Sequence, residues 1–180
     1  MAARLFVIVS GLPGSGKSTL AAGLAPALGL PWIDKDSILE ALFGSLGAGD
    51  HVWRERLSRA SDEVLYATAA LSRGAVLDNW WHHDTSPQRL RQLDGTLVEI
   101  FCDCPAEIAS TRFHQRSRHA GRLDPALSDD QQAARVAQTR DTYRGPLKLG
   151  GPLISVDASV PCDAAAVAGQ VVAARRPRQS

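Results

Sequence analysis

The chain has 180 residues, of which 44% are hydrophobic and 22% are charged, and this composition excludes a disordered chain. Its formal net charge of +1 excludes a general attraction for nucleic acid or for an anionic membrane. No apolar stretch approaches the length of a membrane span, and the apolar run near the N-terminus is too short for a secretory signal. The three cysteines form no paired framework. A cytoplasmic protein is therefore expected.

The apolar pattern predicts strands that alternate with helices. Residues 5–9 are a continuous β-branched and aromatic run, typical of a strand buried on both faces of a parallel sheet. A glycine-rich segment then leads into a helix. Further strands are predicted at residues 31–34, 75–78, 96–102 and 153–156. Helices are predicted at residues 17–28, 37–43, 51–73, 87–93, 105–118, 128–143 and 163–174.

Several residues mark where these helices begin. Ser37 with Glu40, and Ser128 with Gln131, have the spacing of capping boxes, and Pro105 suits a first helical position. The alternating order predicts a parallel sheet with helices on both faces, whose ligands gather at the carboxyl ends of the strands. We expect one domain over residues 1–175 and a short tail over residues 176–180.

The strongest motif is GLPGSGKST at residues 11–19, which satisfies G-x-x-x-x-G-K-[ST] between a predicted strand and a predicted helix. Such a loop turns its backbone N–H groups toward phosphates, and the helix that follows adds its positive dipole end. A chance glycine-rich turn is the alternative. The predicted nucleotide contacts are Gly11, Gly14, Ser15, Gly16, Lys17, Ser18 and Thr19.

Within this loop Lys17 is expected to reach the β- and γ-phosphates, and the Ser18 hydroxyl is expected to join a magnesium shell. The chain lacks the N-K-x-D tetrapeptide that reads guanine, which favours ATP over GTP. ATP and Mg²⁺ are therefore the expected cofactors.

Three carboxylates follow predicted strands. Asp36 is the candidate for accepting the proton of an acceptor hydroxyl, with Asp34 as the second choice and a substrate contact. The alternative for Asp36 is a charge at the start of a helix, although Ser37 could supply that cap. Asp78 ends a hydrophobic run and is expected to hold magnesium, with a simple turn aspartate as the alternative.

A cluster of arginines follows the fourth predicted strand. Guanidinium groups suit the charge that spreads over phosphoryl oxygens in the transition state, whereas a solvated charged face is the alternative. Catalytic roles are predicted for Arg116 and Arg118 and nucleotide contacts for Arg112 and Arg122, in a small lid over about residues 112–127.

Aromatic residues lie where an acceptor pocket would open. The predicted acceptor contacts, besides Asp34, are Phe43, Trp53, Asn79, Trp80, Trp81 and His82. At least one tryptophan is expected to belong to the core instead, because large aromatic side chains also dominate cores. His82 and His83 lack further ligands at zinc spacing.

The phosphate loop, the DKDSI segment at residues 34–38 and the HAGRLD segment at residues 119–124 resemble the P-loop kinases of the AAA_33 and zeta-toxin-like group. This group includes chloramphenicol phosphotransferase, polynucleotide 5'-hydroxyl kinase and gluconate kinase. The resemblance implies an α/β/α sandwich with a five-stranded parallel sheet in the order 2-3-1-4-5 and a helical lid. It also implies Asp36 as general base and lid arginines on the phosphates. The NWWHHD segment at residues 79–84 departs from the group's commoner pattern.

The resulting prediction is an ATP-dependent kinase with an alcohol group as acceptor. Candidate acceptors are an antibiotic, which would make it a resistance enzyme, a sugar or a nucleoside. A nucleic-acid 5'-hydroxyl kinase and an ATP-hydrolysing switch or chaperone remain alternatives. Neither a membrane nor nucleic acid is an expected partner, and the protein could be a monomer or a homodimer.

Overall fold

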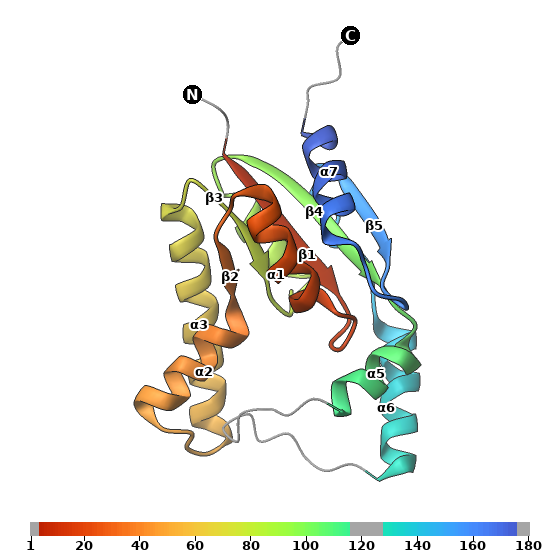
Figure 1. Cartoon of the computed structure of the whole chain (residues 1–180). Coiled ribbons are helices and arrows are strands. Elements are labelled where there is room, and N and C mark those ends of the chain that lie inside the picture. Colours follow the sequence, from red (N-terminus) through yellow and green to blue (C-terminus); the bar gives the residue numbers. More distant parts are fainter. Residues whose placement is uncertain (1–3, 116–127, 176–180) are drawn as a thin grey trace.

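A computed structural model describes residues 4–115 and 128–175. Its centre is a sheet of five parallel strands in the order β2-β3-β1-β4-β5 (Figure 1). The predicted strand order is thereby confirmed. The strands are β1 (Leu5–Gly11), β2 (Trp32–Asp34), β3 (Gly74–Asp78), β4 (Thr96–Asp103) and β5 (Leu153–Asp157).

The central strand β1 is buried along its whole length, as its unbroken apolar run predicts. It pairs with β3 on one side, where Val9 is opposite Asp78, and with β4 on the other, where Gly11 is opposite Cys102. The next pair aligns Asp34 of β2 with Asp78 of β3. Since all strands are parallel, the carboxyl ends of these strands, which carry polar residues, lie at the same edge of the sheet.

The helices agree with the predicted ones to within a few residues. They are α1 (Lys17–Leu28), α2 (Lys35–Leu46), α3 (His51–Leu71), α4 (Ser86–Leu90), α5 (Ala106–His114), α6 (Asp129–Thr142) and α7 (Ala164–Ala174). The capping box of Ser128 and Gln131 is present at the start of α6. Helix α5 ends at His114, before the predicted end, and residues 116–118 of that prediction lie outside the described residues.

Two details of the predicted helix starts are wrong. Ser37 does not cap α2, because the Asp34 side chain accepts from the backbone N–H groups of Asp36 and Ser37. The helix therefore begins at Lys35, where an aspartate directly after a strand can satisfy two free N–H groups. Pro105 is the N-cap of α5 and not its first helical residue.

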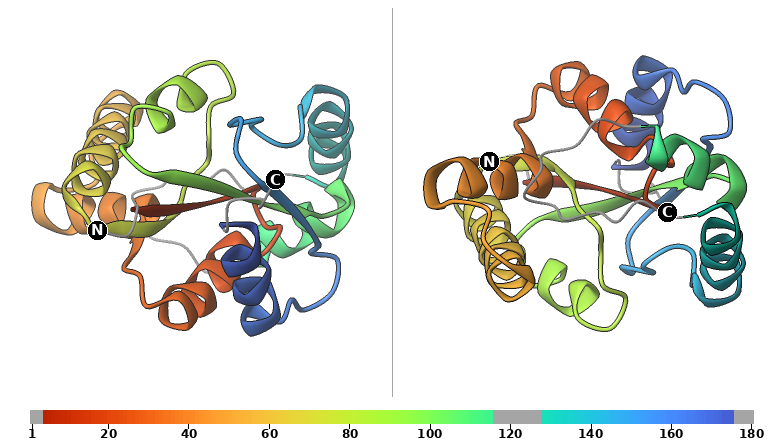
Figure 2. Two further views of the ribbon diagram at one scale, coloured as in Figure 1. Left: turned by 90° about the horizontal axis from the view of Figure 1, so that it is seen from above. Right: turned by 90° about the horizontal axis from the view of Figure 1, so that it is seen from below.

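The helices form two layers around the sheet (Figure 2). Helices α1 and α7 cover one face, and α3 and α4 cover the other. Both layers are closed by apolar cores; Val7 and Val9 of β1 point into the first, and Phe6 and Ile8 into the second. Helices α2 and α3 extend beyond the sheet on one side of the carboxyl edge, and α5 and α6 on the other (Figure 1). None of the described helices is long and apolar enough to cross a membrane.

Candidate active site

The glycine-rich loop lies between β1 and α1, at the carboxyl edge of the sheet. Gly14 has a φ of 83°, and a Cβ atom there would lie 2.0 Å from the carbonyl oxygen of Ala109 in α5. Only glycine fits this position, because the loop packs directly on the α5 backbone. Gly16 adopts a left-handed conformation as the N-cap of α1, and a Cβ there would meet nothing within 4 Å. A side chain at Gly16 would therefore meet open space.

The functional side chains of this loop point inward. Lys17 is only 8% exposed, and its Nζ atom donates to the carbonyl oxygen of Leu12 over 2.9 Å. Ser15 is 1% exposed, and its hydroxyl is buried without a hydrogen-bond partner among the described residues. Because a buried polar group without a partner is costly, this hydroxyl suits a polar ligand held by the loop.

Asp78 lies beside this loop at the end of β3. It is 2% exposed, and its Oδ2 atom has no hydrogen-bond partner in the described part of the chain. Burial raises the pKa of Asp78 to about 6, opposed by the Lys17 ammonium and the Ser18 hydroxyl and reinforced by Asp34 and Asp36. Lys17, Ser18, Asp34 and Asp36 are thus close enough to Asp78 to change its pKa, so the predicted magnesium residues and the predicted general base lie in the same neighbourhood.

The two aspartates after β2 have different surroundings. Both carboxylate oxygens of Asp34 are used by the start of α2, since the Ser37 hydroxyl donates to Oδ2 in addition to the two backbone N–H groups. Asp36 is half-buried in the first turn of α2. Asp34 thus has a structural task, while the carboxylate of Asp36 is near enough to Asp78 to raise its pKa.

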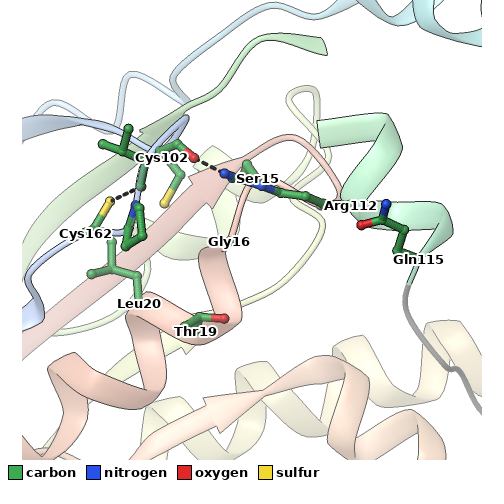
Figure 3. A pocket seen from close by; sticks show the side chains of 12 residues that line it. Ser15, Gly16, Thr19, Leu20, Cys102, Arg112, Gln115 and Cys162 are labelled. Carbon is green, nitrogen blue, oxygen red and sulfur yellow. Dashed lines mark hydrogen bonds between the residues drawn. The ribbon is translucent and has the colours of Figure 1, made fainter. Parts of the chain in front are cut away.

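A cavity of about 440 Å³ adjoins the other side of the loop (Figure 3). It is lined by the loop, by α5 and by the segment between β5 and α7, including Gly16, Thr19, Arg112 and Pro161. The guanidinium of Arg112 donates to the carbonyl oxygens of Ala158 and Ser159, each over 2.6 Å. Arg112 therefore holds this segment against α5 and lines the cavity, and its N–H groups are directed at backbone carbonyls in the present structure.

Thiol groups also border this cavity. Cys102 and Cys162 line it, and Cys104 is buried nearby with its sulfur 3.9 Å from Arg112 Nη1. Burial raises the pKa of all three thiols, that of Cys102 to about 12. They are protonated at neutral pH, and the described residues contain no group of three or more side chains arranged to hold a metal ion.

The predicted acceptor wall is distributed over several places. Phe43 is 2% exposed and packs with Leu39 and Leu57, and its contact with a substrate stays a prediction. Trp81 is likewise a core residue at 4% exposed, and its Nε1 atom donates to the carbonyl of Val9 over 2.8 Å. Phe43 packs in the cluster between α2 and α3, and Trp81 packs in the layer between α3 and the sheet.

The remaining aromatic residues stay near the surface. Trp53 is half-buried, and its Nε1 atom donates to the carbonyl of Gly47. Trp80 is 44% exposed and stacks on Tyr143 with ring centroids 6.2 Å apart. His82 is exposed, and His83 contacts Tyr143 edge-on and bonds the carbonyl of Gly145. Trp80 and His82 alone of the predicted aromatic set present a substantial free surface at this edge.

Two polar residues of α3, Ser58 and Asp62, were not among the residues that the sequence predicted for the site. Asn79, which was predicted, donates from Nδ2 to Asp62 Oδ1 over 2.8 Å, and Lys35 donates from Nζ to Ser58 Oγ over the same distance. The available sequence signal was the spacing of four between polar residues beside the apolar face of the predicted helix. The predicted lid residues Arg116, Arg118 and Arg122 lie outside the described residues.

A family model, AAA_33 (AAA domain), matches residues 6–144. The crystal structure of a proposed kinase from Chloroflexus aurantiacus J-10-fl aligns with a TM-score of 0.80 at 30% sequence identity, over 98% of this chain and 100% of that chain. A shikimate kinase from Acinetobacter baumannii, solved in complex with shikimate, aligns with a TM-score of 0.58 at 17% identity, over 96% of this chain and 92% of that chain. At that identity the likeness shows the fold alone.

The curated relatives are matched over shorter segments. The shikimate kinase of Mycobacterium ulcerans is 37% identical over 95 residues, which cover 51% of this chain and 50% of the relative. This chain therefore spans half or less of the length of the curated relatives that it matches.

Proposed function

Because the chain belongs to the AAA_33 family of AAA domains, we propose that it is a kinase that transfers the γ-phosphoryl group of ATP to a hydroxyl group of a small molecule. The observation that carries this proposal is the buried Asp78 beside the glycine-rich loop, whose pKa responds to Lys17, Ser18 and Asp36. A phosphate loop, a buried carboxylate with an oxygen that has no partner among the described residues, and a nearby candidate base are the parts that phosphoryl transfer requires, and they support the proposal.

The nucleotide is expected to lie across the loop. Its phosphates would accept hydrogen bonds from the backbone N–H groups of residues 14–18. Its base would occupy the 440 Å³ cavity beside Arg112 and Pro161. The planar guanidinium of Arg112 can stack on a purine ring while its N–H groups remain on the carbonyls of the neighbouring segment. Lys17 would exchange its contact with the Leu12 carbonyl for the phosphates.

The residues around Asp78 suit a magnesium ion. Asp78 has one buried oxygen without a partner, and Ser18 adds a hydroxyl, so two hard oxygen ligands are available among the described residues. Mg²⁺ keeps several of its ligands as water and phosphate oxygens, so a site with few protein ligands fits it. When bound, the ion would neutralise charge on the phosphates.

In the transfer itself, Asp36 would accept the proton of the acceptor hydroxyl. The acceptor oxygen forms a bond to the γ-phosphorus as the bond from that phosphorus to the bridging oxygen breaks, and ADP leaves with the electron pair. Lys17 stabilises the charge that develops on the phosphoryl oxygens. The products are ADP and a phosphate monoester of the acceptor.

The test is an ADP-release assay over sugars, hydroxy acids, nucleosides, antibiotics and oligonucleotides, with a mass measurement of the product. We expect ADP formation that depends on a small hydroxyl compound and a product heavier by one phosphate. ADP formation at the same rate without any acceptor would indicate a hydrolase, and preference for oligonucleotides would indicate a nucleic-acid kinase.

The variant Asp36→Asn tests the proposed role of Asp36 as general base. Turnover should fall by roughly 10²- to 10⁴-fold because the amide cannot accept the proton, whereas ATP affinity by calorimetry should stay near that of the wild type. Asp94→Asn, at an exposed position, is the control. Wild-type turnover in Asp36→Asn would remove this residue from the reaction.

A further inference from the structure

One side of α3 carries a stripe of polar residues toward the proposed active site. Arg54, Ser58 and Asp62 are four residues apart, so they share one side of the helix. Each is half-buried, and they flank the buried stripe Leu57, Ser61 and Leu65. The stripe is therefore neither part of the apolar core nor an ordinary solvated face.

Two hydrogen bonds show where this stripe faces. Asp62 accepts from Asn79, which directly follows β3, and Ser58 accepts from Lys35, which directly follows β2. Both partners lie at the carboxyl edge of the sheet, beside Asp78 and Asp36. The stripe thus begins at the site of phosphoryl transfer and runs away from it toward Arg54, along the part of α3 that extends beyond the sheet (Figure 1).

The charges along the stripe change in order. Asp62 and Asn79 lie nearest to the carboxyl edge, and the Oδ1 atom of Asn79 is buried without a hydrogen-bond partner among the described residues. Lys35, which is 9% exposed, bonds the neutral hydroxyl of Ser58. Arg54 comes last, and its Nε atom is shielded from solvent and has no hydrogen-bond partner among the described residues. Hydrogen-bond acceptors therefore come first and cations second.

Arg54 differs from the described arginines that form ion pairs. Arg89, Arg140 and Arg144 each have a carboxylate partner, whereas no described residue forms an ion pair with Arg54. A shielded guanidinium nitrogen without a partner is costly, and an anion supplied by a ligand removes that cost.

We infer that the acceptor is a hydroxy acid, held with its hydroxyl groups at Asp62 and Asn79 and its carboxylate at Lys35 and Arg54. This inference rests on the proposed kinase function. The nine residues from Arg54 to Asp62 cover about 12 Å along the helix, a length that a molecule of about six carbon atoms can match. Asn79 and Asp62 bind hydroxyl groups, and the two cations select for the acid.

The experiment compares acceptors that differ only in their charge. ADP release by the full chain is measured with D-gluconate against D-glucitol, and with shikimate against its methyl ester. We expect kcat/KM for at least one acid to exceed that of its neutral counterpart by roughly 10- to 100-fold, the ratio that a charge-assisted hydrogen bond supports. Equal or better use of the neutral compounds, or no use of either acid, overturns the inference.

Variants locate the effect on α3. Arg54→Ala should raise KM for the acid by roughly 10- to 100-fold while kcat and ATP affinity stay near wild type. Arg59→Ala is the matched control, because Arg59 lies on the same helix but is exposed. Arg54→Gln repeats the test with a side chain of similar length if thermal unfolding shows that the alanine variant is poorly folded.

The outcomes separate the two proposals. An unchanged KM in a folded Arg54→Ala or Arg54→Gln protein contradicts the assignment of the carboxylate to this stripe. Phosphorylation of neutral acceptors only contradicts the hydroxy-acid inference and leaves the kinase function intact. Absence of ATP binding contradicts the kinase function itself.

Discussion

Asp78 is the residue at which folding and the proposed catalysis make opposite demands. Burial raises the pKa of Asp78 from 3.8 to about 6, so the ionised carboxylate that a metal ion needs is disfavoured in the folded protein. A raised pKa means that the native state binds the proton more tightly than the unfolded state. The stabilisation by protonated Asp78 is fully present below pH 3.8 and is lost as the pH rises through 6.

Asp78→Asn should therefore stabilise the protein without ligands at pH 8. We expect the free energy of unfolding to rise by roughly 1–3 kcal/mol, since each unit of pKa shift corresponds to about 1.4 kcal/mol and the amide keeps some cost of burial. The gain should shrink toward pH 4, where the wild-type carboxyl is protonated. Urea unfolding at both pH values, without nucleotide or metal, measures this difference, and loss of Mg²⁺-dependent activity should accompany it. A gain of the same size at both pH values would contradict the linkage.

At the scale of elements, the junction between β2 and α2 combines a cap with the candidate base. Asp34 closes the start of α2 through Asp36 N–H and Ser37 N–H, and this contact fixes the first turn in which Asp36 lies. The carboxylate of Asp34 thus fixes the helical turn that carries Asp36.

Asp34→Ala is expected to lower the free energy of unfolding by about 1–2 kcal/mol, as the loss of an N-cap does, and to reduce turnover as well. Asp50→Ala is the control, since Asp50 caps α3 through Trp53 N–H. It should cost a similar amount of stability in urea unfolding but leave turnover unchanged. Equal turnover in the two variants would show that the cap of α2 has no special role.

A second junction lies between α5 and the segment that follows β5. Arg112 joins them through two carbonyl oxygens and lines the cavity proposed for the nucleotide base. Arg112→Ala should weaken ATP binding by roughly 10- to 100-fold, because the segment loses two charge-assisted hydrogen bonds and the base loses a stacking surface. Calorimetry with an ATP analogue measures this change, and kcat at saturating ATP should stay near wild type. Arg140→Ala, which removes an exposed ion pair with Glu107, is the control.

For the whole molecule, the buried carboxylate of Glu99 joins three parts of the chain. It accepts from Ser10 Oγ of β1 over 2.6 Å, and from the backbone N–H groups of Leu147 and Lys148, which precede β5, over 2.7 and 3.2 Å. Glu99 itself belongs to β4 and is 2% exposed. It therefore ties the central strand and the edge of the sheet into one unit.

Glu99→Gln should reduce the free energy of unfolding by roughly 1–3 kcal/mol, because an amide has only one acceptor oxygen and leaves a buried N–H without a partner. Urea unfolding followed by both circular dichroism and tryptophan fluorescence should show a single shifted transition. Glu63→Gln, which affects an exposed pair with Arg89, should cost less than about 1 kcal/mol. A similar loss in both variants would remove Glu99 from this role.

The sequence was most informative where the signal is local. The apolar run of β1 followed by glycines predicts a strand, a phosphate loop and a helix together, because each depends on neighbouring residues. The roles of Phe43 and Trp81 depend on distant parts of the chain, and both predicted acceptor contacts are buried side chains. An aromatic side chain suits a core and a pocket equally, and only the packing of α2 and α3 on the sheet shows that both are buried.

The sequence by itself determined the order of elements and the chemistry of the loop at residues 11–19, since both follow from periodicity and from conformations that only glycine adopts readily. The tertiary structure decided which distant side chains meet. The pairs Asn79 with Asp62 and Lys35 with Ser58, and the clamp of Arg112 on the segment after β5, join residues 17 to 47 positions apart in the chain. Such contacts depend on the angle at which a helix crosses a sheet, and no local pattern encodes that angle.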